Sequence, residues 1–177
     1  MAMKSTSTHY GAVAITIHWT SAIAIVGTFT FGLMAAGATD PTTEVALLRG
    51  HIVLGSLVLI LTLLRIGWWI WGDRRPAPVA GLPRVQELAA KAVHYGIYAV
   101  ILLMASSGIT TIILSGAGPA LVAGTALPDF SEIIPRIAHG IMSKLLLALL
   151  VAHIGAALYH QFIRRDRLLA RMGLGPA

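Results

Sequence analysis

The sequence predicts an all-α membrane protein in which four transmembrane helices form a bundle, and three observations lead to this prediction. The chain of 177 residues is 56% hydrophobic and only 11% charged, which is too apolar for a soluble domain of this size. Four apolar stretches each reach the ~20 residues that a helix needs to cross ~30 Å of hydrocarbon. Polar residues, glycine and proline separate these stretches. One domain, residues 1–177, is the natural count for this length.

The first two helices are expected over about residues 12–36 and 48–71. The first stretch also resembles a signal peptide, because Lys4 precedes it and an Ala-Gly-Ala sequence closes it. It is long for a signal peptide, so we expect the first helix to be retained. The second helix should end at Gly-Asp-Arg-Arg-Pro-Ala-Pro, residues 72–78, since proline cannot continue a helix.

The third and fourth helices are expected over about residues 93–114 and 137–163. Residues 83–91 are expected to form a short amphipathic turn that leads into the third helix. Residues 115–135 contain several glycines and prolines, which predict a longer loop before the fourth helix.

The basic residues predict the orientation of the bundle. One end would carry nine of them: Lys4, Arg74, Arg75, Arg84, Lys91, Arg164, Arg165, Arg167 and Arg171. The other end would carry only Arg49 and Arg136, together with Asp40, Glu44, Asp129 and Glu132. Because cytoplasmic loops are enriched in Lys and Arg, both termini are expected in the cytoplasm. Basic residues clustered beside apolar segments favour a bilayer, and no nucleic-acid partner is expected.

Four histidines at two depths of the predicted bundle are the candidate functional residues. His139 and His153 lie fourteen residues apart in one helix, so they share nearly one face and are about 21 Å apart along the axis. By depth, His51 of the second helix pairs with His139, and His18 of the first pairs with His153. An ionisable residue inside a membrane is a functional-site hypothesis by default. Two pairs of imidazoles predict axial ligation of two haem irons.

The chain has no cysteine, which excludes covalent attachment through Cys-x-x-Cys-His and thiolate ligation, so any haem is of b type. Two histidine ligands leave no open position on iron, which suits electron transfer. One alternative is that the histidines are isolated polar residues that bond to neighbouring helices. A zinc site or a proton pathway is another.

Other polar residues in the spans have less certain roles. Arg65 lies fourteen residues after His51 and could bind a propionate of the cytoplasmic haem, or could extend to the membrane interface. Lys144 lies off the His139 face, where extension to the interface is expected. His160 and His94 lie near the cytoplasmic side and could donate hydrogen bonds and protons to a quinone. The alternative for both is an interfacial residue bonded to water or to a lipid headgroup.

Taken together, these features resemble the bacterial cytochrome b561 family. The matching pieces are Ile17-His18-Trp19, Arg49-Gly50-His51, His94-x-x-x-Tyr98, Ala138-His139-Gly140, Ala152-His153 and Tyr159-His160. Family members are four-helix, di-haem b proteins of the bacterial inner membrane, and one characterised type is a superoxide:ubiquinone oxidoreductase (superoxide oxidase). The resemblance implies haem ligation by His18, His51, His139 and His153. It also implies a quinone near the cytoplasmic haem, which favours His160.

The function expected from the resemblance is an enzyme that oxidises periplasmic superoxide and reduces ubiquinone. Arg49 and Arg136, together with Lys144, would hold haem propionates and guide the anionic reductant, although the two arginines could also simply mark helix ends. One alternative is a haem-b membrane subunit that relays electrons between a respiratory dehydrogenase partner and the quinone pool. Another is a haem-free transport or structural bundle.

Overall fold

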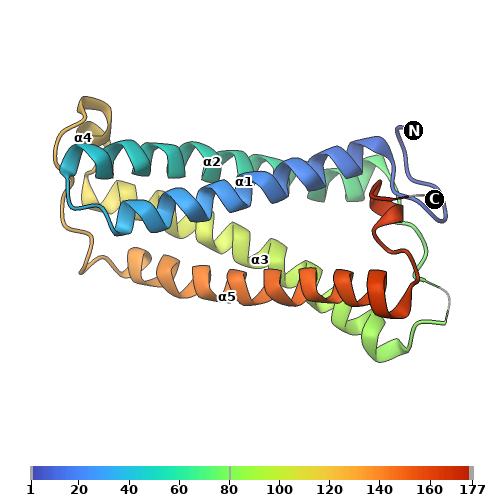
Figure 1. Ribbon diagram of the computed structural model, residues 1–177. Coiled ribbons are helices and arrows are strands. Elements are labelled where there is room, and N and C mark those ends of the chain that lie inside the picture. Colours follow the sequence, from blue (N-terminus) through green and yellow to red (C-terminus); the bar gives the residue numbers. More distant parts are fainter. Residues whose placement is uncertain (1, 80, 176–177) are drawn as a thin grey trace.

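Four long helices form an up-and-down bundle in the computed structural model, which describes residues 2–79 and 81–175 (Figure 1). They are α1 (Ala12–Ala36), α2 (Pro41–Gly67), α3 (Arg84–Ser115) and α5 (Ile134–Leu158). A short helix, α4 (Gly118–Ala123), lies in the connection between α3 and α5. Both termini lie at one end of the bundle, and α4 lies at the other (Figure 1). The prediction of an all-helical, four-span membrane protein is therefore confirmed.

Capping residues place the start of α2 earlier than hydropathy predicted. The helix begins at Pro41 instead of at about residue 48. Asp40 precedes it, and its Oδ2 accepts hydrogen bonds from the backbone nitrogen and the hydroxyl of Thr43 at 2.8 and 2.7 Å. These bonds use one of the backbone donors that a helix start leaves free. Hydropathy marks where a helix enters lipid, whereas the cap marks where the helix begins.

The start of α3 differs from the prediction for the same reason. The short amphipathic turn expected over residues 83–91 is wrong, because residues from Arg84 onward are already the first turns of α3. The carbonyl of Pro83 accepts hydrogen bonds from the backbone nitrogens of Gln86 and Glu87 at 2.9 and 3.2 Å. Proline suits this position because its fixed φ angle and missing N–H cost nothing at a helix start.

Two helices end in π-helical turns at the end of the bundle that carries the termini. The turn Trp68–Gly72 (η1) continues α2, and the turn Tyr159–Arg164 (η2) continues α5. As predicted, the second span stops at Gly72, and Asp73 is extended. After η2 the chain turns back through a short 3-10 helix, η3 (Ala170–Met172).

An apolar layer fills the middle of the bundle. Helix α1 packs mainly against α2, and α3 mainly against α5. The layer consists of Ala24, Val58, Val100, Ile101 and Leu146, so all four long helices contribute to it. In the sequence, Val58 lies midway between residues 51 and 65, and Leu146 lies midway between residues 139 and 153. The layer therefore separates two groups of polar residues at different depths.

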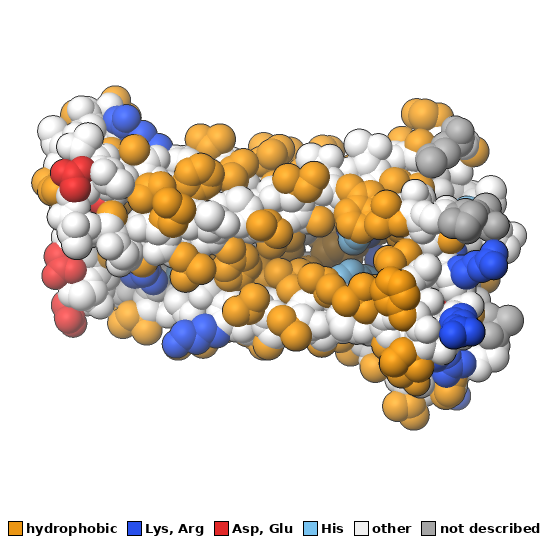
Figure 2. Space-filling view, viewed as in Figure 1, with side chains coloured by type: hydrophobic (Ala, Val, Ile, Leu, Met, Phe, Trp, Pro, Cys, Tyr) orange, Lys and Arg blue, Asp and Glu red, His pale blue; other side chains and the backbone are white. Residues whose placement is uncertain are grey.

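The surface of the bundle matches a membrane environment. Figure 2 shows apolar side chains along the length of the helices and charged side chains gathered at the two ends. We call the end with α4 the acidic end and the end with the termini the basic end. All four long helices are long and apolar enough to span a bilayer. Large apolar side chains such as Ile23, Leu63 and Val151 are more than half exposed, as expected for contact with lipid.

The terminal segments close the basic end. Arg171 donates from Nε to the carbonyl of Thr8 and from Nη2 to the carbonyl of Ala77, both at 2.6 Å. Trp19 of α1 donates from its indole nitrogen to the carbonyl of Met172 at 3.1 Å. One arginine thus connects the N-terminal segment, the connection between α2 and α3, and the C-terminal segment.

A partly exposed carboxylate adds a second connection at the same end. Ser5 donates from its backbone nitrogen and its hydroxyl to Oδ2 of Asp73 at 2.8 and 2.7 Å. Burial opposes the ionisation of Asp73, but these hydrogen bonds outweigh it and hold the pKa of this carboxyl below its usual value. The N-terminal segment is therefore tied to the end of α2.

Candidate functional site

The structure brings His51 of α2 and His139 of α5 together near the acidic end. Their ring centroids are 5.9 Å apart and the planes are inclined at 70°. Nδ1 of His51 lies 2.9 Å from the carbonyl oxygen of Thr28 in α1. Nδ1 of His139 lies 3.0 Å from the carbonyl oxygen of Met104 in α3. These are the two residues that the predicted depths paired.

The two carbonyls fix the protonation of both rings. A carbonyl oxygen can only accept a hydrogen bond, so each Nδ1 must carry the proton and donate it. The Nε2 lone pair of each ring is then free. Metal-binding histidines commonly donate the other ring N–H to a backbone carbonyl, which sets the tautomer and the ring orientation. Each of these imidazoles is therefore prepared to bind iron through Nε2.

A large cavity surrounds this histidine pair. Its volume is about 1120 Å³, and all five helices contribute to its lining. Glycines stand where the imidazoles approach neighbouring helices. A Cβ built on Gly32 of α1 would lie 2.8 Å from Nδ1 of His51, and one on Gly108 of α3 would lie 3.4 Å from a ring carbon of His139. The residues present fit a haem, because they combine two free Nε2 atoms with a large, mainly apolar cavity.

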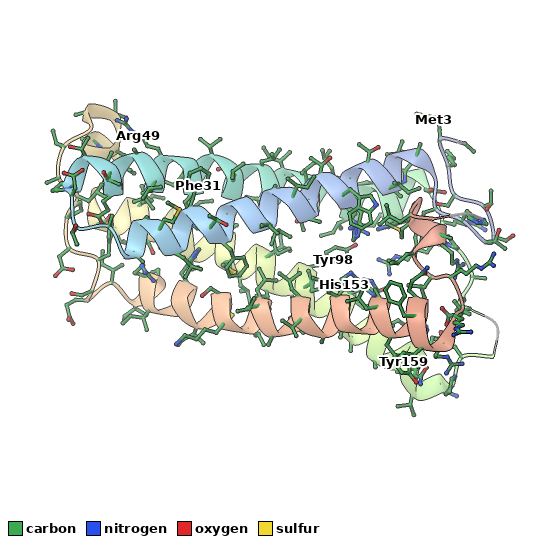
Figure 3. The ribbon with its side chains drawn as sticks, in the orientation of Figure 1. Met3, Phe31, Arg49, Tyr98, His153 and Tyr159 are labelled. Atoms are coloured by element: carbon green, nitrogen blue, oxygen red, sulfur yellow. The ribbon has the colours of Figure 1, made fainter. Side chains whose placement is uncertain are left out.

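Three basic residues line the same cavity: Arg49, Arg136 and Lys144. Arg49 also has a structural partner, since it donates from Nε to the carbonyl of Leu121 at 2.7 Å and from Nη2 to that of Val122 at 2.9 Å. It therefore holds α4 against α2 at the acidic end (Figure 3). The predicted basic surroundings of His51 and His139 exist, but Arg49 is already engaged by two carbonyls.

A second histidine group lies toward the basic end. The rings of His18 in α1 and His153 in α5 are 6.2 Å apart, as their predicted depths require. His94 of α3 lies closer to His153, with 5.0 Å between the ring centroids. Figure 3 shows His153 and Tyr98 toward the basic end, and Figure 2 shows histidine side chains in an opening between α1 and α5. Three imidazoles therefore gather where the sequence predicted two.

Arg65 lies inside this group instead of extending to the membrane interface. Its Nη1 is 2.9 Å from Nδ1 of His18, and its guanidinium carbon is 6.0 Å from the centre of the Tyr98 ring. Its Nε is buried and has no hydrogen-bond partner among the described residues. A guanidinium only donates, so Nδ1 of His18 must accept here and Nε2 must carry the proton. His18 can bind iron through Nε2 only if Arg65 moves to another acceptor.

His160 has a carboxylate partner that the sequence analysis did not identify. Nδ1 of His160 lies 2.5 Å from Oδ2 of Asp166, and the two side chains are only 13% and 15% exposed. Asp166 stands in a run of arginines, so its charge alone suggests a solvated surface residue. The informative signal was a single acidic residue six positions after a candidate histidine.

Comparisons with known proteins agree with this arrangement. The family model for prokaryotic cytochrome b561 matches residues 9–175. Cytochrome b562 of Cereibacter sphaeroides is 29% identical over 172 residues, which cover 92% of this chain and 94% of that protein. Cytochrome b561 homolog 2 of Escherichia coli (strain K12) is 28% identical over 191 residues, with 97% and 95% covered. No solved structure matches the chain significantly.

The family match spans nearly the whole chain, and the relatives match along nearly their full length. Together with four apolar helices, it establishes a multi-pass protein of the bacterial inner membrane that transfers electrons by means of haem b. The chain belongs to the prokaryotic cytochrome b561 family.

Proposed function

We propose that this protein carries electrons from periplasmic superoxide to ubiquinone through two b haems, each held by two histidines. One observation carries the proposal. His51 faces His139 at 5.9 Å, His18 faces His153 at 6.2 Å, and an apolar layer separates the two pairs. By the distribution of basic residues, the acidic end is assigned to the periplasm, and the basic end with both termini to the cytoplasm.

His51 and His139 would hold the periplasmic haem, and His18 and His153 the cytoplasmic one. The two bound haems would supply reversible one-electron chemistry at two depths of the membrane. The carbonyls of Thr28 and Met104 keep the protons of the first pair on Nδ1. Among the described residues no carbonyl accepts from Nδ1 of His18, which faces Arg65 instead.

Arg65 would bind a propionate of the cytoplasmic haem. A buried guanidinium in a membrane needs an anionic or hydrogen-bonding partner, and its Nε has none among the described residues. A carboxylate could accept two parallel hydrogen bonds from it. The same movement would release Nδ1 of His18 and allow that ring to adopt the tautomer that binds iron.

Ubiquinone would bind at the basic end, near His160 and His94. Nδ1 of His94 lies 2.7 Å from the carbonyl oxygen of Ala90, so this ring also keeps its Nε2 lone pair free. Nδ1 of His160 is engaged by Asp166. Quinone carbonyls accept hydrogen bonds and take up protons on reduction, so each imidazole would serve that chemistry after its Nε2 takes up a proton.

Superoxide would be drawn to the acidic end by the basic residues beside the first pair. Arg49, Arg136 and Lys144 line the cavity that contains His51 and His139. Charged groups of this kind raise the association rate of an anion and lose effect as ionic strength rises. Electron transfer would occur at the haem edge, since two histidine ligands leave iron no open position.

One observation favours a second candidate function. Arg49 is already bonded to two carbonyls of the α4 segment, and the same end of the bundle carries Asp40, Glu44, Asp129 and Glu132. Such a surface suits a protein electron donor better than a small anion. In that case the protein would be a membrane subunit that passes electrons from a dehydrogenase to the quinone pool.

The test mixes purified protein with an enzymatic source of superoxide and follows haem absorption, before and after a water-soluble quinone is added. Superoxide should reduce the haem, superoxide dismutase should abolish that reduction, and the quinone should reoxidise the haem. If dithionite reduces the haem but superoxide does not, the superoxide proposal is wrong, and the dehydrogenase-subunit function takes its place.

A further inference from the structure

We propose that Asp166 is a positioning residue that orients His160, so that the pair delivers protons to a quinone at the basic end. The inference rests on the proposed quinone function of His160. It gives Asp166 a role in that function, as the residue that positions the imidazole for proton transfer.

The contact between the two side chains is short and largely shielded from solvent. Oδ2 of Asp166 lies 2.5 Å from Nδ1 of His160, and the side chains are 15% and 13% exposed. The backbone makes the same connection, because the nitrogen of Asp166 donates to the carbonyl of His160 at 3.2 Å. A carboxylate can only accept, so Nδ1 of His160 carries a proton and Nε2 is the atom available to a ligand.

The backbone on both sides of Asp166 is held in an unfavourable conformation. Arg165 and Arg167 have φ angles of 58° and 54°, and they are the only non-glycine residues with positive φ in the described part of the chain. Residues other than glycine seldom adopt this region, and such conformations cluster at functional sites. The two reversals turn Asp166 back onto the π-helical turn that contains His160. Arg165 is also the residue that ends the π-helical turn, in the left-handed conformation common at helix ends.

The carboxylate prefers the imidazole to the neighbouring arginines. Nε of Arg164 lies 3.9 Å from Oδ2 of Asp166, which is well beyond hydrogen-bond distance. Oδ1 of Asp166 is buried and has no hydrogen-bond partner among residues 2–79 and 81–175. Asp166 therefore interacts with His160 through Oδ2, and its Oδ1 has no partner among the described residues.

The pair suits the proton chemistry of quinone reduction. A quinone becomes a quinol by taking two electrons and two protons, and in the proposed function two superoxide ions supply the electrons and leave as O₂. The Asp166 carboxylate accepts the Nδ1–H of His160 and leaves Nε2 for proton exchange. His160 takes a proton from solvent on Nε2 and gives it to a quinone oxygen, while its Nδ1–H stays hydrogen-bonded to Asp166. Solvent at the basic end returns a proton to Nε2 before the second transfer.

The experiment uses the haem-loaded protein, reduced beforehand, and mixes it rapidly with increasing concentrations of a water-soluble quinone. Haem reoxidation gives a limiting rate and a half-saturating quinone concentration. Asp166→Asn should lower the limiting rate about 10- to 100-fold, within the range of general acid–base effects, with little change in the half-saturating concentration. Asp166→Glu, which keeps the charge, should restore most of the rate. Glu87→Gln at the same end, where Glu87 pairs with Lys91 on the surface, is the matched control and should leave the rate unchanged.

A double variant separates positioning from a general structural effect. If Asp166 acts through His160, the combination of Asp166→Asn with His160→Gln should be no slower than His160→Gln alone. The rate in D₂O relative to H₂O should fall further in Asp166→Asn, because proton transfer becomes limiting. Should Asp166→Asn lose its haem spectrum, Asp166→Ser replaces it in the same comparison.

The outcomes distinguish the inference from the proposed function. If His160→Gln slows reoxidation and the Asp166 variants do not, the role of Asp166 is wrong and the quinone site stands. If neither position affects reoxidation, the quinone role of His160 is wrong, and the inference about Asp166 falls with it.

Discussion

Replacing Gly32 with alanine should weaken haem binding at the acidic end and leave the basic end unchanged. A Cβ at this position would lie 2.8 Å from Nδ1 of His51, closer than real Cβ atoms come, and 3.0 Å from Cε1, which is a tight contact. The imidazole would have to move by about 0.6 Å to reach the 3.4 Å of an ordinary contact. The side chains of a binding site must lie within ~0.5 Å of the geometry that binds the ligand. The displacement would also disturb the hydrogen bond from His51 to Thr28, which fixes the tautomer.

The size of the effect follows from what such supporting contacts contribute elsewhere. Disturbing the hydrogen-bond partner of a metal-binding histidine typically lowers metal affinity 10- to 100-fold. That range corresponds to about 1.4–2.8 kcal/mol of haem-binding free energy. The assay measures the rate at which each haem is lost to an excess of a soluble haem-binding protein, followed by absorption and by the low-spin signals in electron paramagnetic resonance.

Gly55→Ala is the matched control. Gly55 also lines the cavity, one turn beyond His51, but its Cβ would meet only a methyl group of Thr28 at 3.7 Å, an ordinary contact. One haem of Gly32→Ala should therefore dissociate faster, while Gly55→Ala resembles the parent. Equal haem loss in the two variants would refute the reasoning about His51, and equal loss of both haems in Gly32→Ala would point to general misfolding.

Three further predictions concern the two ends of the bundle. A C-terminal fusion to a reporter that works only in the cytoplasm should be active, and activity of a periplasmic reporter there would reverse the assigned orientation. Exchanging Arg49 and Arg136 together for glutamine should slow haem reduction by superoxide and flatten its salt dependence, with quinol-driven reduction unchanged; an unaltered rate and salt dependence would exclude these arginines as the entry point. Arg171→Ala removes the hydrogen bonds to Thr8 and Ala77. Backbone amides of the N-terminal segment should then exchange faster with solvent, while the haem spectra persist. Unchanged exchange would show that Arg171 does not hold this end together.

The sequence predicted those features that depend on local periodicity and composition. Apolar length located four spans, and helix geometry placed His139 and His153 on one face at two depths. The same arithmetic predicted that His51 would meet His139 and that His18 would meet His153, and the structure brings both pairs together.

Features that depend on contacts between distant segments could not be predicted in this way. Arg65 approaches His18 across 47 positions of sequence, and Arg49 meets the carbonyl of Leu121 across 72. No periodicity encodes either contact. The turn that brings Asp166 back to His160 relies on two residues with positive φ, which composition gives no reason to expect. The starts of α2 and α3 were also missed, since caps such as Asp40 lie outside the apolar stretches.

Each chain should hold two b haems, each between two histidines. This can be measured by redox titration of the purified protein, followed by absorption and by electron paramagnetic resonance. We expect two haems per chain, both low-spin, with one signal altered by His51→Ala or His139→Ala and the other by His18→Ala or His153→Ala. A single haem per chain, or both signals unchanged in any of these four variants, would show that the proposed ligation is wrong.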